Sequence, residues 1–509
     1  MRILRFFINR FFLSILFVIL QIAVFFYFQI FLSDYFVYFN LVSASLGVVV
    51  YIFLVNQGIN PDHKIPWIIL ISIVPLFGIG LFILFSPNRV KKSHYEAYLN
   101  HLQKVRETLP FSHDMIRVRA IDLGAYYGQS EYLYRTNAFP AYSHTKTDYF
   151  ASGESLFMKM REDVSEAKSF IFLEYFIIDK GYLWSEILEI LKRKVSEGVE
   201  VRVIYDDVGT IGKLSLNYDK KLRKMGIKCV NFNRVNVFFS SIYNNRDHRK
   251  ITVIDGTIGY IGGANIADEY VNRKTRFGHW KDGGLRLEGE GVKALTGMFM
   301  QMYAMHSKQS EDLRPYVIRD FPYFSSQGYV QAFGDGPKPL YEHQIAHSAY
   351  CQIINQAQHY VTITTPYLII DFVMKTTLIN AALRGVEVNI VTAGIPDKKI
   401  IYAMTRSNYP ALLDAGIKIY EYKPGFIHTK MIIADDQVGI IGTINLDYRS
   451  LVHNYECGVF MYRTSALTSM RHDIEATLKK SELQTKKTAR QSLPVRLFCS
   501  VLNAFQTLL

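Results

Sequence analysis

The chain has 509 residues, 49% of them hydrophobic, and a formal net charge of +13 at pH 7. This length exceeds a small single domain and is sufficient for a membrane segment plus two domains of ordinary size. The positive charge indicates an anionic partner, either nucleic acid or an anionic bilayer, and charge alone does not choose between them. The cysteines lack C-x-x-C spacing, which predicts buried thiols rather than a zinc site or a disulfide framework. They are Cys229, Cys351, Cys457 and Cys499.

Three apolar runs open the chain, at about 11–32, 35–55 and 65–85. Each approaches the roughly 20 residues that a helix needs to cross a bilayer, so residues 1–90 are predicted to be a transmembrane region. A cleavable signal peptide is the alternative for the first run, but that run is longer than a signal sequence and two more follow. Basic residues flank the region at both ends, which the positive-inside rule would place together in the cytoplasm. The number of true spans, two or three, and the membrane side of the active site are therefore left open.

Residues 91–145 are predicted to be a linker that begins with a helix. Beyond it, strand-like, helix-like and strand-like stretches follow one another: SFIFLEYFII, WSEILEILKRKVSEG and VEVRVIYDD. A second series has the same order: YVTITTPYLII, KTTLINAALRG and VEVNIVTAG. Buried strands alternating with helices predict an α/β fold in each half. The predicted halves are 146–333 and 334–485, with the turn GDGP at the seam.

One stretch occurs twice, as HRKITVIDGTIGYIGGAN at 248–265 and as HTKMIIADDQVGIIGTIN at 428–445. At matching offsets the copies supply His248, Lys250, Asp255 and Asn265, and then His428, Lys430, Asp435 and Asn445. Residues i and i+2 of a strand share a face, so each His and its Lys point the same way. A lysine neutralises phosphate oxygens while an imidazole acts on phosphorus. The repeat therefore predicts one phosphate site built by two halves, in which one His attacks and the other protonates the leaving oxygen. A chance surface His-x-Lys is the alternative, and two complete copies make it rare.

Both copies resemble the HKD motif of the phospholipase D superfamily, including the Gly-x-x-Asn that ends it. The chain further resembles the bacterial cardiolipin synthases of that superfamily. The stretches that carry this likeness are LEYFII, YDDVG, FGHWKD and RLEG in the first half, and QAFGDGP, TPYLII, GFIHTK and NYE in the second. The resemblance implies two phospholipase D-like α/β halves that form one pseudo-symmetric catalytic unit. It also implies transmembrane helices before them and a multi-pass protein of the cell membrane.

The same resemblance implies a phosphatidyltransferase that moves a phosphatidyl group from one phosphatidylglycerol to another. The products would be cardiolipin and glycerol, the intermediate a phosphatidyl-histidine, and the partners anionic lipid and membrane. No cofactor, metal or nucleic acid is expected, and the oligomeric state is left open. His248 is expected to be the nucleophile, and His428 the general acid and then base. The residues expected to hold phosphate oxygens are Lys250, Lys430, Asn265 and Asn445. Asp255 and Asp435, grouped with the catalytic set, fit an architectural role equally well.

A catalytic imidazole needs an acceptor that fixes its far nitrogen. Glu456 lies where the superfamily places such a carboxylate in the second half, and Asp282 is a candidate in the first. At Asp282 the chain departs from the family, which usually has Thr-His after this position, so an ordinary surface Asp is an equal alternative. Gly263 likewise replaces the hydroxyl residue that Thr443 keeps. Three other carboxylates at strand ends are expected to settle turns rather than touch substrate: Glu174, Asp206 and Asp207.

The chain ends in a basic tail, residues 486–509. A helix from Pro494 would align apolar residues on one face, which is typical of an amphipathic helix on an anionic membrane. These residues are Phe498, Val501, Leu502, Phe505 and Leu509. Packing of this helix on the protein's own surface is the alternative.

Other functions stay open at this stage. A hydrolase, either a phospholipase D or a nuclease, would use the same site, because only exclusion of water from the intermediate separates transfer from hydrolysis. Transfer to a different alcohol acceptor is a further alternative. A non-catalytic scaffold that binds anionic lipid is less consistent with two complete His-Lys sets. The acyl-chain preference leaves no visible mark on the sequence.

Overall fold

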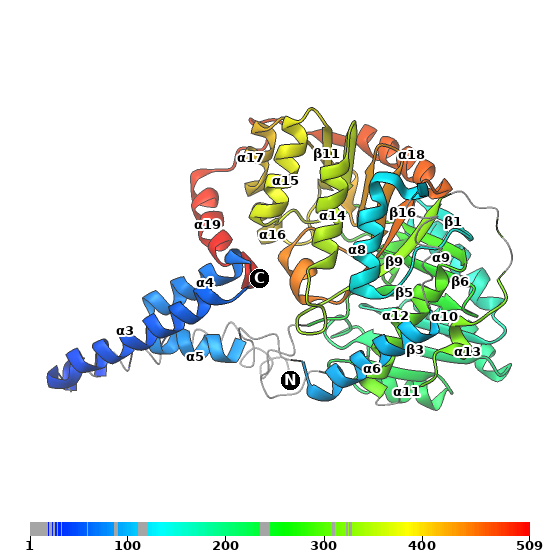
Figure 1. Ribbon diagram of the computed structural model, residues 1–509, viewed down its shortest axis with the longest axis horizontal. Coiled ribbons are helices and arrows are strands. Elements are labelled where there is room, and N and C mark those ends of the chain that lie inside the picture. The colour runs from blue at the N-terminus through cyan, green and yellow to red at the C-terminus, as the bar shows by residue number, and fades with distance from the viewer. Residues whose placement is uncertain are drawn as a thin grey trace. The chain divides into compact units, whose positions relative to one another are not determined.

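The computed structural model describes scattered positions between 19 and 31 and then residues 33–58, 60–85, 90–109, 121–234, 245–307, 311–321, 324 and 328–508. The chain forms two compact units (Figure 1). The smaller unit holds the N-terminal helices with residues 235–244 and 500–509, and the larger unit holds the rest. The predicted first span, residues 11–32, lies almost entirely outside the described residues.

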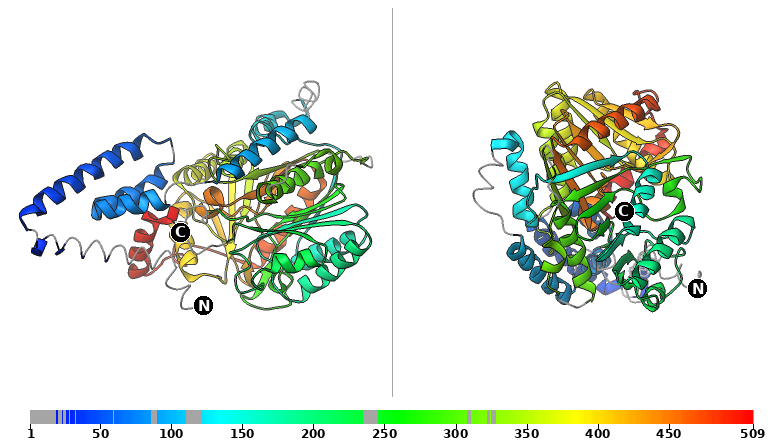
Figure 2. Two further views of the ribbon diagram at one scale, coloured as in Figure 1. Left: turned by 90° about the horizontal axis from the view of Figure 1, so that it is seen from below. Right: turned by 90° about the vertical axis from the view of Figure 1, so that its right-hand side faces the viewer.

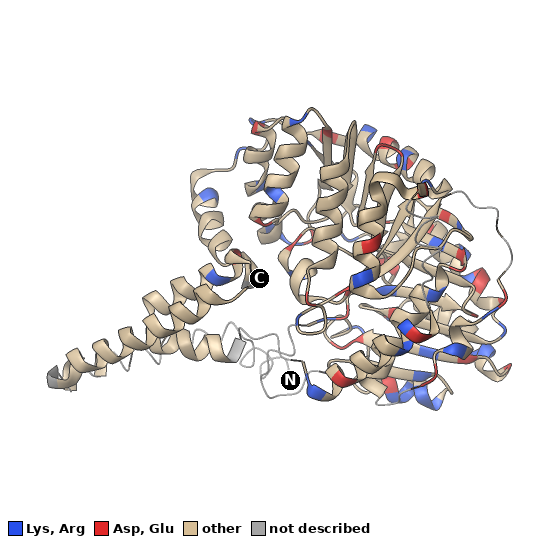
Figure 3. Cartoon of the chain, viewed as in Figure 1, with Lys and Arg blue, Asp and Glu red and all other residues tan. Residues whose placement is uncertain are grey.

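The described part of the smaller unit is built from apolar helices with few charged side chains (Figure 3). They are α3 (Ser33–Asn56), α4 (Pro61–Ile73) and α5 (Pro75–Phe85). The predicted third span, 65–85, is divided because Pro75, which has no amide hydrogen, begins a new helix. Helix α5 packs so closely on α4 that a Cβ at Gly78 would lie 2.8 Å from the Ile71 Cα. Among the described residues, only Tyr35–Asn56 is a helix long and apolar enough to cross a membrane. The prediction of a multi-pass protein is therefore not supported in this part of the chain.

The larger unit contains two sheets with the same internal plan. The first has the order β1 (Thr145–Phe150), β8 (Gly284–Gly289), β6 (Ile258–Gly262), β5 (Lys250–Ile254), β2 (Phe170–Tyr175), β3 (Glu200–Asp206) and β4 (Lys228–Phe232). The second has the order β17 (Ser481–Leu483), β12 (Lys418–Tyr422), β11 (Glu387–Ala393), β10 (Tyr360–Thr364), β14 (Met431–Ala434), β15 (Val438–Gly442), β16 (Glu456–Tyr462) and β9 (Tyr329–Asp335).

Each sheet joins a parallel set of strands to an antiparallel set. Strands β2, β3 and β4 are parallel, as are β10, β11 and β12. Strand β5 runs antiparallel to β2, and β14 runs antiparallel to β10. The predicted α/β class and the two similar halves are confirmed. A short parallel pair, β7 (His279–Lys281) with β13 (Gly425–Ile427), ties the halves together.

Helices flank the strands (Figure 1, Figure 2). In the first half these are α9 (Gly153–Ser165), α10 (Tyr182–Ser196), α11 (Tyr218–Lys224), α12 (Val292–Ser307) and α13 (Arg314–Val317). In the second they are α14 (Ile345–Gln356), α15 (Phe372–Leu383), α16 (Lys399–Ser407), α17 (Tyr409–Asp414) and α18 (Ser465–Lys479). A further helix, α19 (Leu493–Ala504), follows them near the C-terminus. Helix α12 contacts strands of both sheets, and one hydrophobic core runs through both halves. The four cysteines are buried free thiols, as predicted.

Two segments differ from the predicted domain plan. The predicted linker contains α6 (Lys92–Thr108) and α8 (Tyr127–Asn137), which pack on the larger unit. His101 of α6, for example, is buried and its Nε2 lies 2.9 Å from the Gly297 carbonyl oxygen. Strand β9 begins at Tyr329, before the predicted seam, and pairs with β16 of the second half. Both differences have the same cause. The predicted linker and the stretch before the seam have a polar or turn-rich sequence, but their apolar residues still pack into the core.

The C-terminal helix α19 exposes a different apolar stripe from the predicted one. Phe498 and Val501 are exposed as expected, whereas Leu502 and Phe505 are half-buried. Leu509 lies outside the described residues. Leu497 and Leu493, about one and two turns before Val501, complete the exposed stripe.

Candidate active site

Each repeated His lies at the edge of its sheet where a parallel strand ends. Lys250 pairs with Tyr175, the last residue of β2, and Met431 pairs with Thr364, the last residue of β10. The two His-x-Lys stretches therefore begin at the carboxyl ends of β2 and β10. Parallel α/β sheets bind ligands beyond this edge.

Backbone hydrogen bonds bind each repeat to the opposite half. The His248 amide donates to the Tyr455 carbonyl oxygen over 2.9 Å. The His428 amide donates to the Lys281 carbonyl oxygen over 2.7 Å. These links place each His beside a carboxylate contributed by the other half.

The carboxylate that orients each His comes from the other half of the chain. The Nδ1–H of His248 donates to Glu456 over 2.9 Å, and that of His428 donates to Asp282 over 2.7 Å. Both carboxylates are fully buried. Each also stands two residues before a glycine that pairs with the repeat of the same half: Gly458 pairs with Gly442, and Gly284 pairs with Gly262. The pairing leaves both Nε2 atoms available for chemistry, and each of these two pairs takes one member from each half.

The Glu456 carboxylate sits in a dense set of side-chain donors. The hydroxyl of Thr443 donates to it over 2.5 Å, the hydroxyl of Ser450 over 2.6 Å and the amide of Asn454 over 3.3 Å. Burial raises the pKa of Glu456 to about 7, against the opposing effects of Lys250 and these donors. Glu456 is therefore firmly held but only partly ionised at neutral pH.

The Asp282 carboxylate has fewer partners and keeps its charge. Besides His428 it accepts the Gly283 amide over 2.9 Å. Burial works to raise the pKa of Asp282, but the contact with His428 and the charge of Lys430 outweigh it and hold that pKa below its usual value. Space here is tight, because a Cβ at Gly263 would lie 2.3 Å from the Asp282 Oδ1. This contact explains why glycine stands where the second repeat has a hydroxyl residue.

The two lysines and two histidines form a buried cluster of titratable groups. Burial lowers the pKa of Lys250 to about 8 and that of Lys430 to about 7. Each ammonium donates to the carbonyl oxygen of its own His. Burial, followed by the lysine charges, lowers the pKa of His428 to about 4 and the pKa of His248 well below its usual range. Both imidazoles are neutral at pH 7 in the unliganded protein, and one can attack while the other accepts a proton.

Aromatic rings surround the two histidines unequally. Tyr270, Trp280 and Phe426 have ring centroids 5.5, 5.4 and 5.8 Å from that of His428. His248 has Phe176 at 5.2 Å. The sequence reasoning did not assign these rings, although Trp280 and Phe426 stand within two residues of Asp282 and His428 in the stretches HWKD and GFIH. An aromatic residue at that spacing is the signal that could have identified them.

Three carboxylates lie at or near the carboxyl ends of the strands beside His248. Asp206 accepts the amides of Val208 and Gly209, and also that of Asp247 over 3.1 Å. It therefore settles a turn, as expected, and holds the residue before His248. Glu174 is fully buried, and burial raises its pKa well above the usual value. Asp207 accepts the side-chain amide of Asn231 over 2.8 Å, a structural contact between strand ends.

The two motif asparagines do not occupy equivalent environments. The Asn265 side chain accepts the Ile177 amide over 2.9 Å and donates to the Tyr270 hydroxyl over 2.8 Å. Both of its polar atoms are thus committed to the loops around the site, and the predicted phosphate contact through Asn265 is not what this geometry favours. Asn445 is also buried, and its Oδ1 has no hydrogen-bond partner. Asn445 remains the asparagine with unused hydrogen-bonding capacity.

The motif aspartates lie at the wrong end of their strands for chemistry. Asp255 follows β5 and accepts the amides of residues 168, 169 and 170. Asp435 follows β14 and accepts those of residues 358, 359 and 360. Both have positive φ angles, of 53°. Their grouping with the catalytic set is corrected here, because each carboxylate closes a turn at the edge opposite to the histidines.

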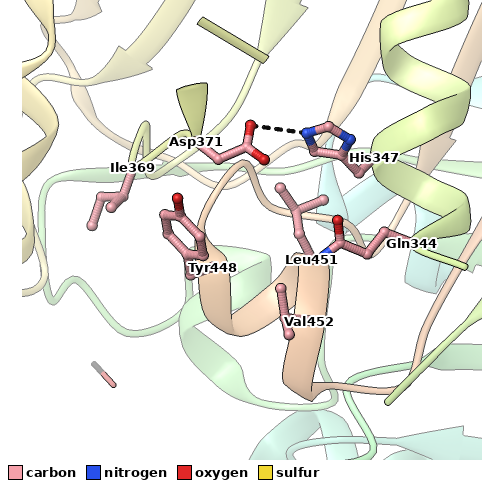
Figure 4. A pocket seen from close by; sticks show the side chains of 7 residues that line it. All are labelled: Gln344, His347, Ile369, Asp371, Tyr448, Leu451 and Val452. Atoms are coloured by element: carbon pink, nitrogen blue, oxygen red, sulfur yellow. Dashed lines mark hydrogen bonds and ion pairs between the residues drawn. The ribbon is translucent and has the colours of Figure 1, made fainter. Parts of the chain in front are cut away.

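A third His-carboxylate pair lies in the second half. The Nε2 atom of His347 is 2.9 Å from Asp371, and both side chains border a small cavity with Tyr448 and Leu451 (Figure 4). The cavity has room for about one water molecule. Asp371 also caps α15 by accepting the Met374 amide over 2.8 Å. This pair lacks a lysine two residues along a strand, so its role is to hold the start of α15.

Comparisons with known proteins agree with the geometry. The family model described as "Cardiolipin synthase, PLD-like domain" matches residues 160–276 and 350–478. A protein from Streptococcus mutans is 43% identical over 88% of this chain and 96% of its own length. A cardiolipin synthase of a Geobacillus species is 33% identical over 92% of this chain and 93% of its own. A cardiolipin synthase of Halalkalibacterium halodurans is 34% identical over 84% of each chain.

Among solved structures, the phosphatidylserine synthase of Haemophilus influenzae superposes with a TM-score of 0.56. It is 14% identical, and the match covers 75% of this chain and all of that one. At this identity the likeness concerns the fold of the two halves.

Proposed function

Because the chain belongs to the cardiolipin synthase family of phospholipase D-like proteins and is a phosphatidyltransferase, we propose that it joins two molecules of phosphatidylglycerol. The products are cardiolipin and free glycerol. The observation that carries the proposal is the crossed pair of dyads, His248 with Glu456 and His428 with Asp282. Such an arrangement supplies a nucleophile and a separate acid-base group at one phosphate.

In the first step, the Nε2 atom of His248 attacks the phosphorus of one phosphatidylglycerol. A P–N bond forms, the P–O bond to the terminal glycerol breaks, and His428, which holds a proton on Nε2 once the anionic diester has raised its pKa, gives that proton to the leaving oxygen. In the second step, His428 takes the proton from the glycerol hydroxyl of another phosphatidylglycerol. The hydroxyl oxygen attacks phosphorus, the P–N bond breaks, and His248 is restored. Lys250 and Lys430, with Asn445, neutralise and position the non-bridging oxygens.

The difference between the two carboxylates supports these roles. Asp282 keeps its charge and so favours a proton on His428, whereas burial and the lysine charges lower the pKa values of both histidines in the unliganded protein. A bound phosphate diester adds negative charge and raises both values. Glu456, held by three side-chain donors, fixes the ring of His248 while contributing less negative charge. His248 is therefore the better nucleophile and His428 the better acid and base.

The reaction is tested with the purified full-length chain and vesicles of phosphatidylglycerol as the only lipid. No nucleotide or other phosphatidyl donor is added, and the lipid products and glycerol are measured together. Equal amounts of cardiolipin and glycerol are expected. Phosphatidic acid with glycerol would instead establish hydrolysis, and the proposal would be abandoned. A variant with both His248→Ala and His428→Ala serves as the matched control for contaminating activity.

A further inference from the structure

One group of exposed apolar side chains on the larger unit lies where the catalytic strands end. We define the rim loops as residues 177–182, 207–217, 268–279, 366–373 and 394–400. They contain eight large apolar residues that are more than a third exposed: Tyr182, Val208, Ile211, Leu216, Phe372, Val373, Ile395 and Ile400. Phe372 is 73% and Leu216 is 68% exposed. Apolar side chains are stabilised when they are removed from water. A concentration of exposed ones therefore indicates a surface that contacts another molecule or a membrane.

The rim loops lie on the same edge as the two histidines. Four of them follow the carboxyl ends of β2, β3, β10 and β11, which are parallel within each sheet. The fifth carries Tyr270, whose ring contacts His428. The loop 394–400 of the second half also lies close to the first half. The charge of Lys398 lowers the pKa of His248, and the charge of Asp397 raises the pKa of Tyr270. The apolar residues thus surround the mouth of one site.

Charge on the rim loops is strongly one-sided. Lys and Arg supply all the exposed charged side chains on them: Lys180, Arg273, Lys274, Arg276, Lys398 and Lys399. Their acidic residues are buried or half-buried: Asp179, Asp207, Asp268, Glu269, Asp371 and Asp397. One of the cations, Arg273, lies over the ring of the exposed Tyr182 with its guanidinium carbon 3.4 Å from the ring centroid. Apolar groups interleaved with cations match the chemistry of an anionic bilayer surface.

The opposite edge of the same sheets has a different composition. Its turns expose acids and bases together: Glu166, Glu197, Glu387, Asp414 and Asp436 with Lys168, Arg384 and Lys418. Leu383, at the far end of α15 from Phe372, is 72% exposed there. The basic and apolar character is therefore a property of the rim loops and not of the whole unit.

We propose that the rim loops are a docking surface that seats the mouth of the catalytic unit directly on an anionic lipid bilayer. Phe372, Val373, Ile211 and Leu216 enter the acyl boundary, and the exposed lysines and arginines lie among the anionic head groups. A lipid then reaches the histidines without leaving the bilayer, and water is excluded at the mouth. The benefit to catalysis rests on the proposed function, whereas the docking itself requires only anionic lipid.

Docking is measured with nitroxide spin labels on the full-length chain in vesicles of phosphatidylglycerol and phosphatidylcholine. The native cysteines are buried, so a label attaches selectively to an introduced one. Phe372→Cys and Ile211→Cys test the rim, and Leu383→Cys is the matched control, since it lies on the same helix as Phe372 with nearly equal exposure. Power saturation with oxygen and with a water-soluble nickel complex reports the depth of each label. Labels at 372 and 211 are expected in the acyl region and the label at 383 in water. Aqueous values at all three positions would overturn the proposal.

A kinetic measurement separates docking from chemistry. The double variant Phe372→Ser with Val373→Ser should lower the rate on dilute phosphatidylglycerol in vesicles by about tenfold. Its rate on dihexanoyl phosphatidylglycerol, dispersed as monomers, should stay within about twofold of the unaltered protein, and Leu383→Ser should change neither rate. An equal loss on both substrates would contradict docking and place these residues in the site. If the unaltered protein made no cardiolipin, the proposed function would fail while the label depths still decided the docking.

Discussion

The two halves of the active site share a plan but differ in how they hold their histidines. In both, a His-x-Lys stretch begins at the end of a parallel strand, and a carboxylate from the other half accepts the Nδ1 hydrogen. Glu456 receives three further side-chain donors and has a pKa of about 7. Asp282 receives one backbone amide and stays ionised. An internal repeat has thus given two imidazoles with the same Nδ1 contact and with carboxylates that differ in charge at neutral pH.

This difference gives a physical reason for dividing the reaction between the halves. A general acid needs a nearby negative charge that stabilises its protonated form, which Asp282 supplies to His428. A nucleophile needs a neutral ring held in a fixed orientation, which the Glu456 network supplies to His248. Two identical half-sites would offer no preference for which His attacks first. The predictions below test whether the asymmetry has this consequence.

The largest effects are expected from removing each imidazole. His248→Ala should lower kcat by about 10⁶-fold, the order found when a nucleophile is removed. His428→Ala should lower it by about 10² to 10⁴-fold, the usual contribution of general acid-base catalysis. Mass spectrometry of protein quenched in acid-free medium should find a phosphatidyl adduct on His248 and accumulate it in the His428→Ala variant. An adduct mapped to His428 would reverse the comparison.

Exchanging each carboxylate for its amide tests the charge difference directly. Asp282→Asn should lower kcat by about 10³-fold, because an amide keeps the shape but loses the charge that stabilises protonated His428. Glu456→Gln should cost only about tenfold to 100-fold, because Glu456 is already partly protonated at neutral pH. Steady-state kinetics on phosphatidylglycerol vesicles measure both. Equal losses would show that the two carboxylates act only as hydrogen-bond acceptors.

The sequence predicted the repeated elements more completely than the contacts between them. The alternation of strands and helices follows from local patterns, and the structure has it. The predicted strand that carries both His248 and Lys250 is shorter than expected, because β5 begins at Lys250 and leaves His248 before it. The crossed pairing could not be read in this way, because Glu456 lies 208 residues from His248 and no local pattern links them. Asn265 was expected to bind phosphate, because the type of a side chain does not show that the Ile177 amide and the Tyr270 hydroxyl already occupy both of its polar atoms.

Close packing explains why the first repeat has a glycine at position 263, which the sequence shows without giving a reason. The glycine at 263 was noted as a loss of the hydroxyl kept by Thr443, with no reason for it. In the folded chain, Asp282 and the His428 carbonyl occupy the space that a Cβ would need. Mean hydropathy likewise did not show that Pro75 divides residues 65–85 into two helices.

The glycine contact predicts that the second dyad is the more sensitive to crowding. In Gly263→Ala the new Cβ would lie 2.3 Å from the Asp282 Oδ1 and 2.8 Å from the His428 carbonyl oxygen, so Asp282 must shift. A loss of about 10 to 100-fold in kcat is expected. Thr443→Ala, which removes one of several donors to Glu456, should cost about tenfold or less. A larger loss in Thr443→Ala than in Gly263→Ala would contradict the view that Glu456 is the better supported carboxylate.

The lowered pKa values of Lys250 and Lys430 predict that activity falls as the pH rises above neutral. Burial lowers their pKa values to about 8 for Lys250 and about 7 for Lys430, so the cationic form is present below these values and lost above them. Because the cation binds phosphate, kcat/KM should decline as pH rises through 7 to 8. Lys430→Arg stays charged and should move this decline up by about one pH unit, to the value set by Lys250. A pH profile that does not move would exclude Lys430 as the group that titrates.

The smallest effect on chemistry is expected at the motif aspartates, where the two halves should behave alike. Asp255→Ala and Asp435→Ala each leave three backbone amides without their acceptor and place alanine at a positive φ angle. Each should lower the free energy of unfolding by about 2–3 kcal/mol, seen as a lower thermal midpoint. The kcat per folded molecule should change less than about twofold, because both carboxylates lie at the edge opposite to the histidines. Asparagine keeps one acceptor and tolerates positive φ, so Asp255→Asn should recover part of the stability. A loss of kcat without a loss of stability would contradict this view. It would mean that both carboxylates take part in the reaction.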